Sequence, residues 1–117
     1  MKVLFCRWQH DADLIQVAEG YQAVLELAKT YQTNFWLQDL RKRSYSDKAF
    51  AFEKDLVLAL DKTLSIHTYI AYLMLPLQKE LITKGTPLVR TNNNLTIRYF
   101  INEHDALLWL ERKQQNI

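Results

Sequence analysis

The sequence predicts an α/β fold: a single domain spanning residues 1–117, with a mostly parallel sheet of four or five strands and helices packed against it. Short apolar segments rich in Val, Ile, Phe, Trp and Tyr alternate four times with longer segments whose apolar residues recur at helical spacing. This alternation is typical of βαβ crossovers, which join parallel strands through a helix. The chain has 117 residues, 49% of them hydrophobic, which is enough for one core without disulfides or metal.

The first strand is predicted at Lys2–Trp8, and the polar residues that follow end it. From Asp13 the pattern becomes helical, and Asp13 and Gln16 have the spacing of a capping box. Gly20 lies inside this helix, where it costs up to about 1 kcal/mol relative to Ala, so we expect close packing at that point. The predicted inner face consists of Leu14, Val17, Ala18, Tyr21, Val24, Leu25 and Ala28.

The second strand is predicted at Phe35–Leu40 and leads into a loop with three basic residues. Ser46 can cap a second helix that runs to about Leu64. Phe50 and Val57 lie one heptad apart on the flank of this helix. The helix is therefore apolar over more of its circumference than one contact with the sheet requires, and this excess indicates a partner surface. Its predicted core face consists of Ala49, Phe52, Leu56, Ala59 and Leu60.

The third strand is predicted at Ile66–Leu75, whose nearly continuous apolar run is typical of a central strand covered on both faces. Pro76 ends this strand. A short helix follows at Leu77–Lys84, and Gly85 ends it.

Alternating residues predict a fourth strand at Leu95–Ile101. Asn102 can cap the last helix. The inner face of that helix is expected to carry Ala106, Leu107 and Leu110.

Charge and cysteine content exclude several classes of protein. The net charge of +2 is too small for a field that would hold nucleic acid or an anionic membrane. The lone Cys6 cannot form an internal disulfide, which fits a reducing compartment and predicts a cytoplasmic protein. The apolar run Val3–Phe5 is too short for a signal peptide or a membrane span, so no membrane association is expected.

Three segments carry a family resemblance: KVLFCRW at 2–8, FWLQDL at 35–40 and YFINEHDALLWLERK at 99–113. Together they resemble STAS domains, relatives of the bacterial anti-sigma-factor antagonists, and the resemblance covers almost the whole chain. It implies an α/β fold and a regulatory role through protein interaction. In that family a serine at the start of the second helix is phosphorylated, and Ser44 and Ser46 stand in this region. The family's Asp-Ser-Gly or Asp-Ser-Ser-Gly pattern is missing here, so the resemblance supports the fold and an interaction role more than a phosphorylation switch.

Parallel strands place their carboxyl ends, and the loops after them, at one edge of the sheet, where helix amides also gather. We therefore expect a binding surface at this edge. We expect Trp8–His10, Asp39–Ser46, Pro76–Lys79 and Asn102–His104 to meet there. The candidate ligand-binding or partner-binding residues are Trp8, His10, Asp39, Arg41, Arg43, Ser44 and Ser46 at this edge, and Phe50 and Val57 on the flank of the second helix.

Each candidate residue also has a structural explanation. Arg41, Lys42 and Arg43 could hold a phosphate or carboxylate near helix amides, or they could be solvated charges that follow a strand. Ser46 is a candidate phosphorylation site, although a helix cap also explains it. Asp39 is expected to pair with Arg41 or to cap the turn rather than to act in catalysis.

No catalytic, metal or cofactor site is predicted. Cys6 lies in the middle of a strand without an activating base, and His10, His67 and His104 lack the spacing of zinc ligands. We therefore predict a non-catalytic interaction module that docks a protein partner or a second copy of itself through the second helix and the basic loop. The alternative is a domain that binds a small anionic ligand through the loops at the strand ends.

Overall fold

A five-stranded sheet with helices on both faces confirms the predicted α/β fold. The computed structural model describes residues 2–44, 47–83 and 89–115. The elements in chain order are β1 (Leu4–Arg7), α1 (Leu14–Tyr31), β2 (Phe35–Asp39), α2 (Asp47–Thr63), β3 (Thr68–Leu73), α3 (Pro76–Thr83), β4 (Val89–Thr91), β5 (Leu95–Phe100) and α4 (Glu103–Gln115).

The strand order in the sheet is β1-β2-β3-β5-β4. β1, β2, β3 and β5 run parallel, and β4 pairs antiparallel with β5 at the edge. The sheet is therefore mostly parallel, as predicted. The sequence did not reveal β4, because its three residues are too few to show an alternating pattern.

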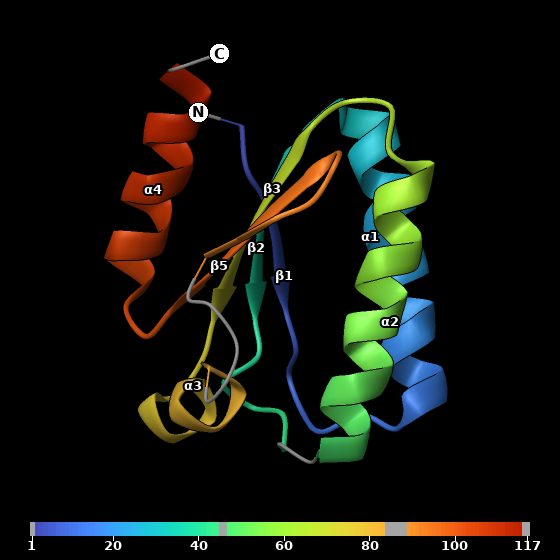
Figure 1. Ribbon diagram of the computed structural model, residues 1–117, viewed down its shortest axis with the longest axis vertical. Helices are drawn as coiled ribbons and strands as arrows, with labels where there is room; N and C mark the ends of the chain where they lie inside the picture. Colours follow the sequence, from blue (N-terminus) through green and yellow to red (C-terminus); the bar gives the residue numbers. More distant parts are fainter. Residues whose placement is uncertain (1, 45–46, 84–88, 116–117) are drawn as a thin grey trace.

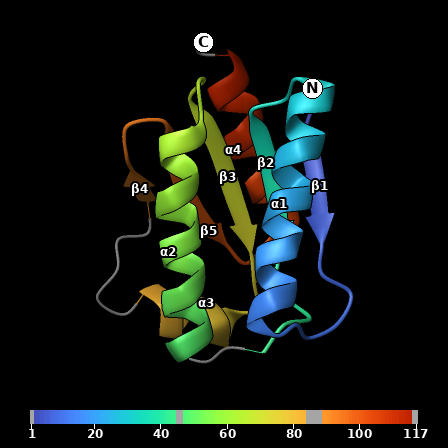
Figure 2. The same cartoon turned by 90° about the vertical axis from the view of Figure 1, so that its right-hand side faces the viewer.

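Two layers of helices cover the sheet, as Figures 1 and 2 show: α1 and α2 lie on one face and α4 on the other. Successive residues of a strand point to opposite faces, so Trp36 packs in the core under α1 and α2 while Leu37 packs under α4. β3 is central, and its Ile70 and Ala71 are both fully buried. The prediction of a central strand covered on both faces is confirmed.

Helix α1 begins as the sequence predicts. The Gln16 amide donates to the Asp13 carboxylate at 2.8 Å, and the Asp13 amide donates to the Gln16 side chain at 2.9 Å, which completes the capping box. Four residues of the predicted inner face are buried, namely Val17, Tyr21, Val24 and Ala28. The helix ends where Gln32 adopts a left-handed conformation with φ of 52°.

Gly20 allows the Trp8 ring to lie directly against α1. A Cβ atom at Gly20 would stand 2.3 Å from Cη2 of Trp8, which is closer than any real contact. The expected close packing is therefore confirmed.

The predicted core face of α2 is wrong in part. Val57 is only 3% exposed and belongs to the core, whereas Ala59 is exposed. The buried arc also contains Glu53 and Asp61, and these polar residues disguised the true inner face of the helix. Val57 therefore does not form a docking flank. The side chain of Phe50, the other residue of that flank, lies outside the described residues.

Helix α4 follows the prediction. The Asn102 side chain accepts a hydrogen bond from the Asp105 amide at 3.1 Å and so caps the helix. Ala106 and Leu110 are fully buried, and Trp109 lies in the same core as Phe35 and Leu37. In the described part of the chain, none of the helices has the length and apolar character needed to cross a membrane.

Candidate docking surface at the carboxyl rim

The four parallel strands end at one edge of the sheet, which we call the carboxyl rim. Arg7 of β1 is the register partner of Asp39 in β2, Asp39 is the partner of Leu73 in β3, and Leu73 is the partner of Phe100 in β5. α1, α2, α3 and α4 all begin at this edge (Figure 1). The predicted location of the binding surface therefore exists as one continuous edge.

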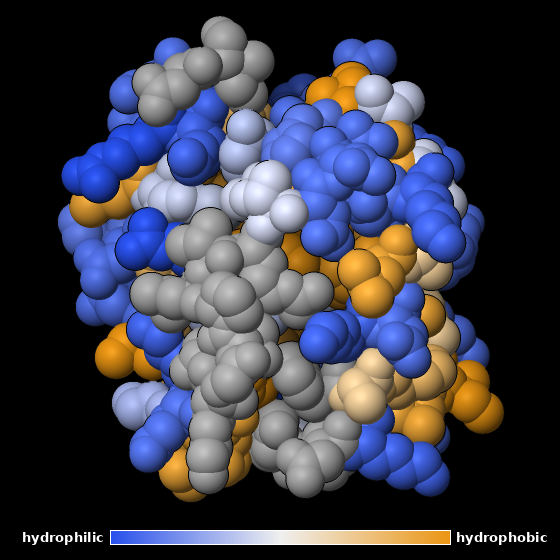
Figure 3. Space-filling view, in the orientation of Figure 1, coloured by the Kyte–Doolittle hydropathy of each residue, from blue (hydrophilic) through white to orange (hydrophobic). Residues whose placement is uncertain are grey.

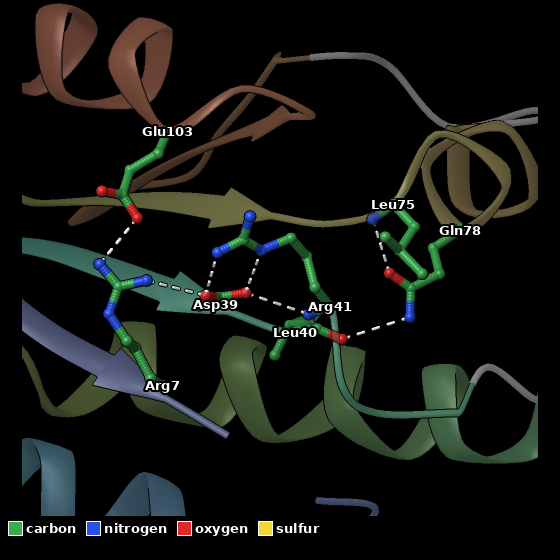
Figure 4. A network of polar contacts seen from close by, with 7 residues as sticks. All are labelled: Arg7, Asp39, Leu40, Arg41, Leu75, Gln78 and Glu103. Carbon is green, nitrogen blue, oxygen red and sulfur yellow. Dashed lines mark hydrogen bonds and ion pairs between the residues drawn. The ribbon is translucent and has the colours of Figure 1, made fainter. Parts of the chain in front are cut away.

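Asp39 lies between two guanidinium groups at this rim, as Figure 4 shows. Arg41 donates to both of its carboxylate oxygens, through Nε at 3.0 Å and Nη2 at 2.8 Å, and Arg7 donates to Oδ2 at 3.0 Å. Arg7 also donates to Glu103 at 2.7 Å, so that β1, β2 and α4 are joined. Burial raises the pKa of Asp39, but the hydrogen bonds from Arg41 outweigh it and keep the pKa below its ordinary value. The expected pairing of Asp39 with Arg41 is confirmed.

Arg43 leaves the loop and enters the interior between the sheet and α2. Its side chain is only 6% exposed, and its two terminal nitrogens donate to both oxygens of Glu53 at 2.7 and 3.1 Å. The guanidinium also lies over the Trp8 ring, 4.7 Å from the centroid. Trp8 in turn donates to the Gln38 side chain at 3.0 Å. Arg43 and Trp8 are therefore structural here, held by contacts within the molecule.

Two tyrosines complete this buried polar cluster. The Tyr21 hydroxyl donates to Glu53 at 2.5 Å and lies 2.6 Å from the Tyr72 hydroxyl, which acts as the donor between them because Tyr21 has no second proton. Burial raises the pKa of both phenols well above its ordinary value. Burial also raises the pKa of the neighbouring Cys6 thiol to about 11, so this thiol is an unreactive one.

Ser44 and His10 both contact the loop after β1. The Ser44 amide donates to the Asp11 carboxylate at 3.0 Å, and the Ser44 hydroxyl and amide bonds lower the pKa of Asp11. Nδ1 of His10 lies 2.7 Å from the Asp11 carbonyl oxygen. The Ser44–Asp11 bond links the basic loop to the loop after β1, whereas the His10 contact lies within that second loop. Ser46, the candidate phosphorylation site, lies outside the described residues.

The pairing of arginines bears directly on anion binding. Of the three basic side chains in the loop, Arg41 is neutralised by Asp39 and Arg43 by Glu53. Lys42 is exposed. An incoming phosphate or carboxylate would meet Lys42 alone without displacing a carboxylate from Arg41 or Arg43, so the loop is a poor cradle for an anion.

Gln78 attaches α3 to the basic loop. Its side-chain amide donates to the Leu40 carbonyl at 3.2 Å, and its oxygen accepts from the Leu75 amide at 2.7 Å (Figure 4). The same side-chain amide also donates to the Arg43 carbonyl at 2.6 Å. The bond from the Leu75 amide is the one at the start of α3, where it caps the first turn. The loop and α3 therefore form one surface.

Apolar side chains are exposed on and beside α3. Leu77 is 64% exposed and Leu81, one turn further along the helix, is 43% exposed. Leu75 before α3 and Ile101 before α4 are also about half exposed, at 47% and 49%. Figure 3 shows hydrophobic surface at the lower end of the molecule, where Figure 1 places α3.

The sequence placed 76–79 at this rim, but the bonding roles of Gln78 and of Glu53 were not predicted. Gln78 carried a signal, because a glutamine three residues after Leu75 has the spacing of a capping box. Glu53 also carried one, since it precedes Val57 by one helical turn on what proves to be the buried arc. Nothing in the sequence indicated that Arg43 turns inward to reach Glu53.

In the described part of the chain, no group of three or more His, Cys, Asp or Glu side chains is placed to hold a metal ion. Comparison of the chain with protein-family models, with curated proteins and with solved structures gave no match in any of the three. Function is therefore inferred from the geometry of the carboxyl rim.

Proposed function

We propose that the protein is a non-catalytic interaction module of STAS-like type that docks a second copy of itself through the carboxyl rim. The observation that carries this proposal is the order of side chains along the rim. The basic loop follows β2, the exposed leucines of α3 follow β3, and the acidic first turn of α4 follows β5. β2, β3 and β5 are neighbours in the sheet, so the order is basic, apolar, acidic.

The apolar part supplies the driving force. Leu77 and Leu81 lie one turn apart on α3, with Leu75 and Ile101 nearby in the chain connections of the same rim. Clustered exposed leucines and isoleucines of this kind mark interaction surfaces, because their removal from water is favourable by about 25 cal/mol per Å².

The charged parts favour a second copy over an arbitrary partner. Within the described residues, Lys42 at one side of α3 and Asp105 at the other form no ion pair, and both are exposed. A two-fold axis through α3 would bring Lys42 of each copy towards Asp105 of the other. The rim is thus self-complementary, with opposite charges flanking an apolar centre.

The rim is also preorganised for docking. Gln78 bonds the loop to α3, and the Arg7, Asp39 and Glu103 side chains join the ends of β1 and β2 to α4. A surface fixed in this way loses little conformational entropy on association.

This surface differs from the one expected from the sequence. Val57 of α2 lies in the core and cannot contact a partner, so α3 replaces α2 as the docking helix. The alternative of a small anionic ligand at the same loops has less support, because Arg41 and Arg43 already pair with carboxylates.

Light scattering at increasing protein concentration tests the proposal. The wild-type chain is expected to approach twice the mass of one chain, and Leu77→Asp is expected to remain a monomer because a buried carboxylate would lack a partner. Ile66→Asp is the matched control, since Ile66 is 65% exposed but precedes β3 at the opposite edge of the sheet. A wild-type chain that stays monomeric, or a Leu77→Asp variant that still dimerises, would refute self-docking through this rim.

A further inference from the structure

A hollow lies at the opposite edge of the sheet, where the parallel strands begin, and we call it the amino-rim hollow. Its volume is about 490 Å³, within the range of about 300–1,000 Å³ that is usual for small-molecule sites. It is bounded by the last turns of α1 and α2 and by the first residues of β2 and β3. Figure 2 shows α1 and α2 side by side on this face of the sheet.

The floor and walls of the hollow are largely apolar. Trp36 and Ala28 are buried and form its deeper part, and Leu25 and Leu64 are half-buried along its sides. Apolar surface of this kind favours an apolar ligand body.

The charge at the mouth of the hollow is positive. Among the described residues that line it, Lys29 is the one charged side chain, and it is exposed in the last turn of α1. Lys29 forms no ion pair with another described residue. An anionic group at the mouth would therefore meet a cation and no carboxylate.

Other polar groups at this edge are already bonded within the protein. The Thr63 hydroxyl donates to the Leu60 carbonyl, the Thr68 hydroxyl to the Ile66 carbonyl, and the Trp36 indole to the Thr33 carbonyl. Gln32 and Ser65 also line the hollow, but among its described lining residues Lys29 supplies the charge that would anchor an anionic group.

We propose that the amino-rim hollow binds a small amphipathic carboxylate, with its apolar chain or ring against Leu25, Leu64 and Trp36 and its carboxylate at Lys29. This site is separate from the carboxyl rim, so the inference does not depend on self-docking. The basic loop, where the sequence suggested an anion site, plays no part in it.

Titration of the ¹⁵N-labelled protein with octanoate, followed by amide chemical shifts, tests the proposal. We expect saturable shifts that centre on the residues lining the hollow, and weaker binding of octanol and octylamine. Lys29→Ala should weaken octanoate binding by about threefold, the effect of one solvent-exposed ion pair, and should not weaken octanol binding. Lys62→Ala is the control, because Lys62 is an exposed lysine in the last turn of α2 that does not line the hollow.

A second pair of variants blocks the hollow itself. Ala28→Met fills the floor of the hollow from a buried position, and Ser65→Tyr covers its mouth from an exposed position. Because Ser65 is exposed, the Ser65→Tyr variant should retain the fold even if Ala28→Met does not. Either folded variant is expected to lose octanoate binding. The proposal is overturned if octanoate produces no saturable shifts, if the shifts centre elsewhere, if Lys29→Ala binds as well as the wild type, or if the folded blocked variants still bind.

Discussion

At the scale of single residues, the ion pair between Arg43 and Glu53 is the one whose burial costs the fold most. The two side chains are 6% and 9% exposed, and Glu53 also accepts the Tyr21 hydroxyl bond. Burial of an ion pair is costly, so each partner depends on the other to compensate for lost hydration. The pair holds the basic loop against α2 and thereby fixes where the carboxyl rim begins.

Glu53→Ala is expected to lower the free energy of unfolding by about 3–5 kcal/mol, because it leaves a buried guanidinium without a counter-charge. Urea denaturation measures this. Asp55→Ala, an exposed acid on the same helix, should change stability by no more than about 0.5 kcal/mol. The double variant Arg43→Met with Glu53→Leu should recover most of the loss, since both charges are removed together. A cost for Glu53→Ala no larger than that for Asp55→Ala would show that the pair is not buried as described.

Asp39 links stability to acid pH. Hydrogen bonds from Arg41 outweigh the effect of burial and lower the pKa of Asp39 in the folded chain, whereas the unfolded value is about 3.9. The carboxylate therefore contributes stability above about pH 4, and this contribution is lost as the pH falls through the folded value.

Asp39→Asn removes this titration. The difference in unfolding free energy between the wild type and Asp39→Asn is expected to be largest near neutral pH and to shrink below about pH 4. Denaturation of both proteins in urea at a series of pH values measures the difference. A difference that stays constant from neutral to acid pH would contradict the assigned role of Asp39.

Among elements, the two long helices show why one inner face was predicted and the other was not. α1 buries apolar residues at helical spacing, and its capping box joins Asp13 and Gln16, which are three residues apart. Both features can therefore be recognised from a short stretch of sequence. α2 buries Glu53 and Asp61, whose partners lie outside the helix: Arg43 in the preceding loop for Glu53, and the Asn94 amide further along the chain for Asp61. Hydrophobic periodicity assigns such residues to the outer face, which is why the predicted face was rotated.

Gly20 of α1 tests the contact between this helix and the end of β1. Gly20→Ala would gain about 1 kcal/mol of helix propensity, but its Cβ would overlap the Trp8 ring, so we expect a net loss of stability. In a Trp8→Leu background the overlap is absent, and the same substitution should be stabilising. Thermal unfolding of the four proteins measures both effects. If Gly20→Ala stabilised the wild-type chain, the close approach of Trp8 would be wrong.

For the molecule as a whole, strand direction determined most of what could be predicted. Four strand segments separated by helices predict parallel strands, and parallel strands end at a common carboxyl rim. The structure has this rim at Arg7, Asp39, Leu73 and Phe100. The sequence could not show which loop charges were already paired, because Arg43 and Glu53 meet only after folding. The STAS-like assignment stays a prediction.

Docking through the rim predicts a specific coupling between Lys42 and Asp105. In a two-fold dimer each residue faces the other across the interface, although the two lie at different ends of the rim within one chain. Replacing either residue by one of opposite charge should weaken dimerisation by more than about tenfold, since two exposed pairs worth about 0.7 kcal/mol each are lost and become repulsive.

The most direct measurement is the dimer dissociation constant, determined by sedimentation at low salt, for Lys42→Glu, Asp105→Lys and the variant that carries both changes. We predict that each single variant dimerises weakly and that the double variant returns to within about threefold of the wild type, because the swapped charges again attract. A double variant that dimerises no better than the weaker single variant would contradict self-docking through the carboxyl rim.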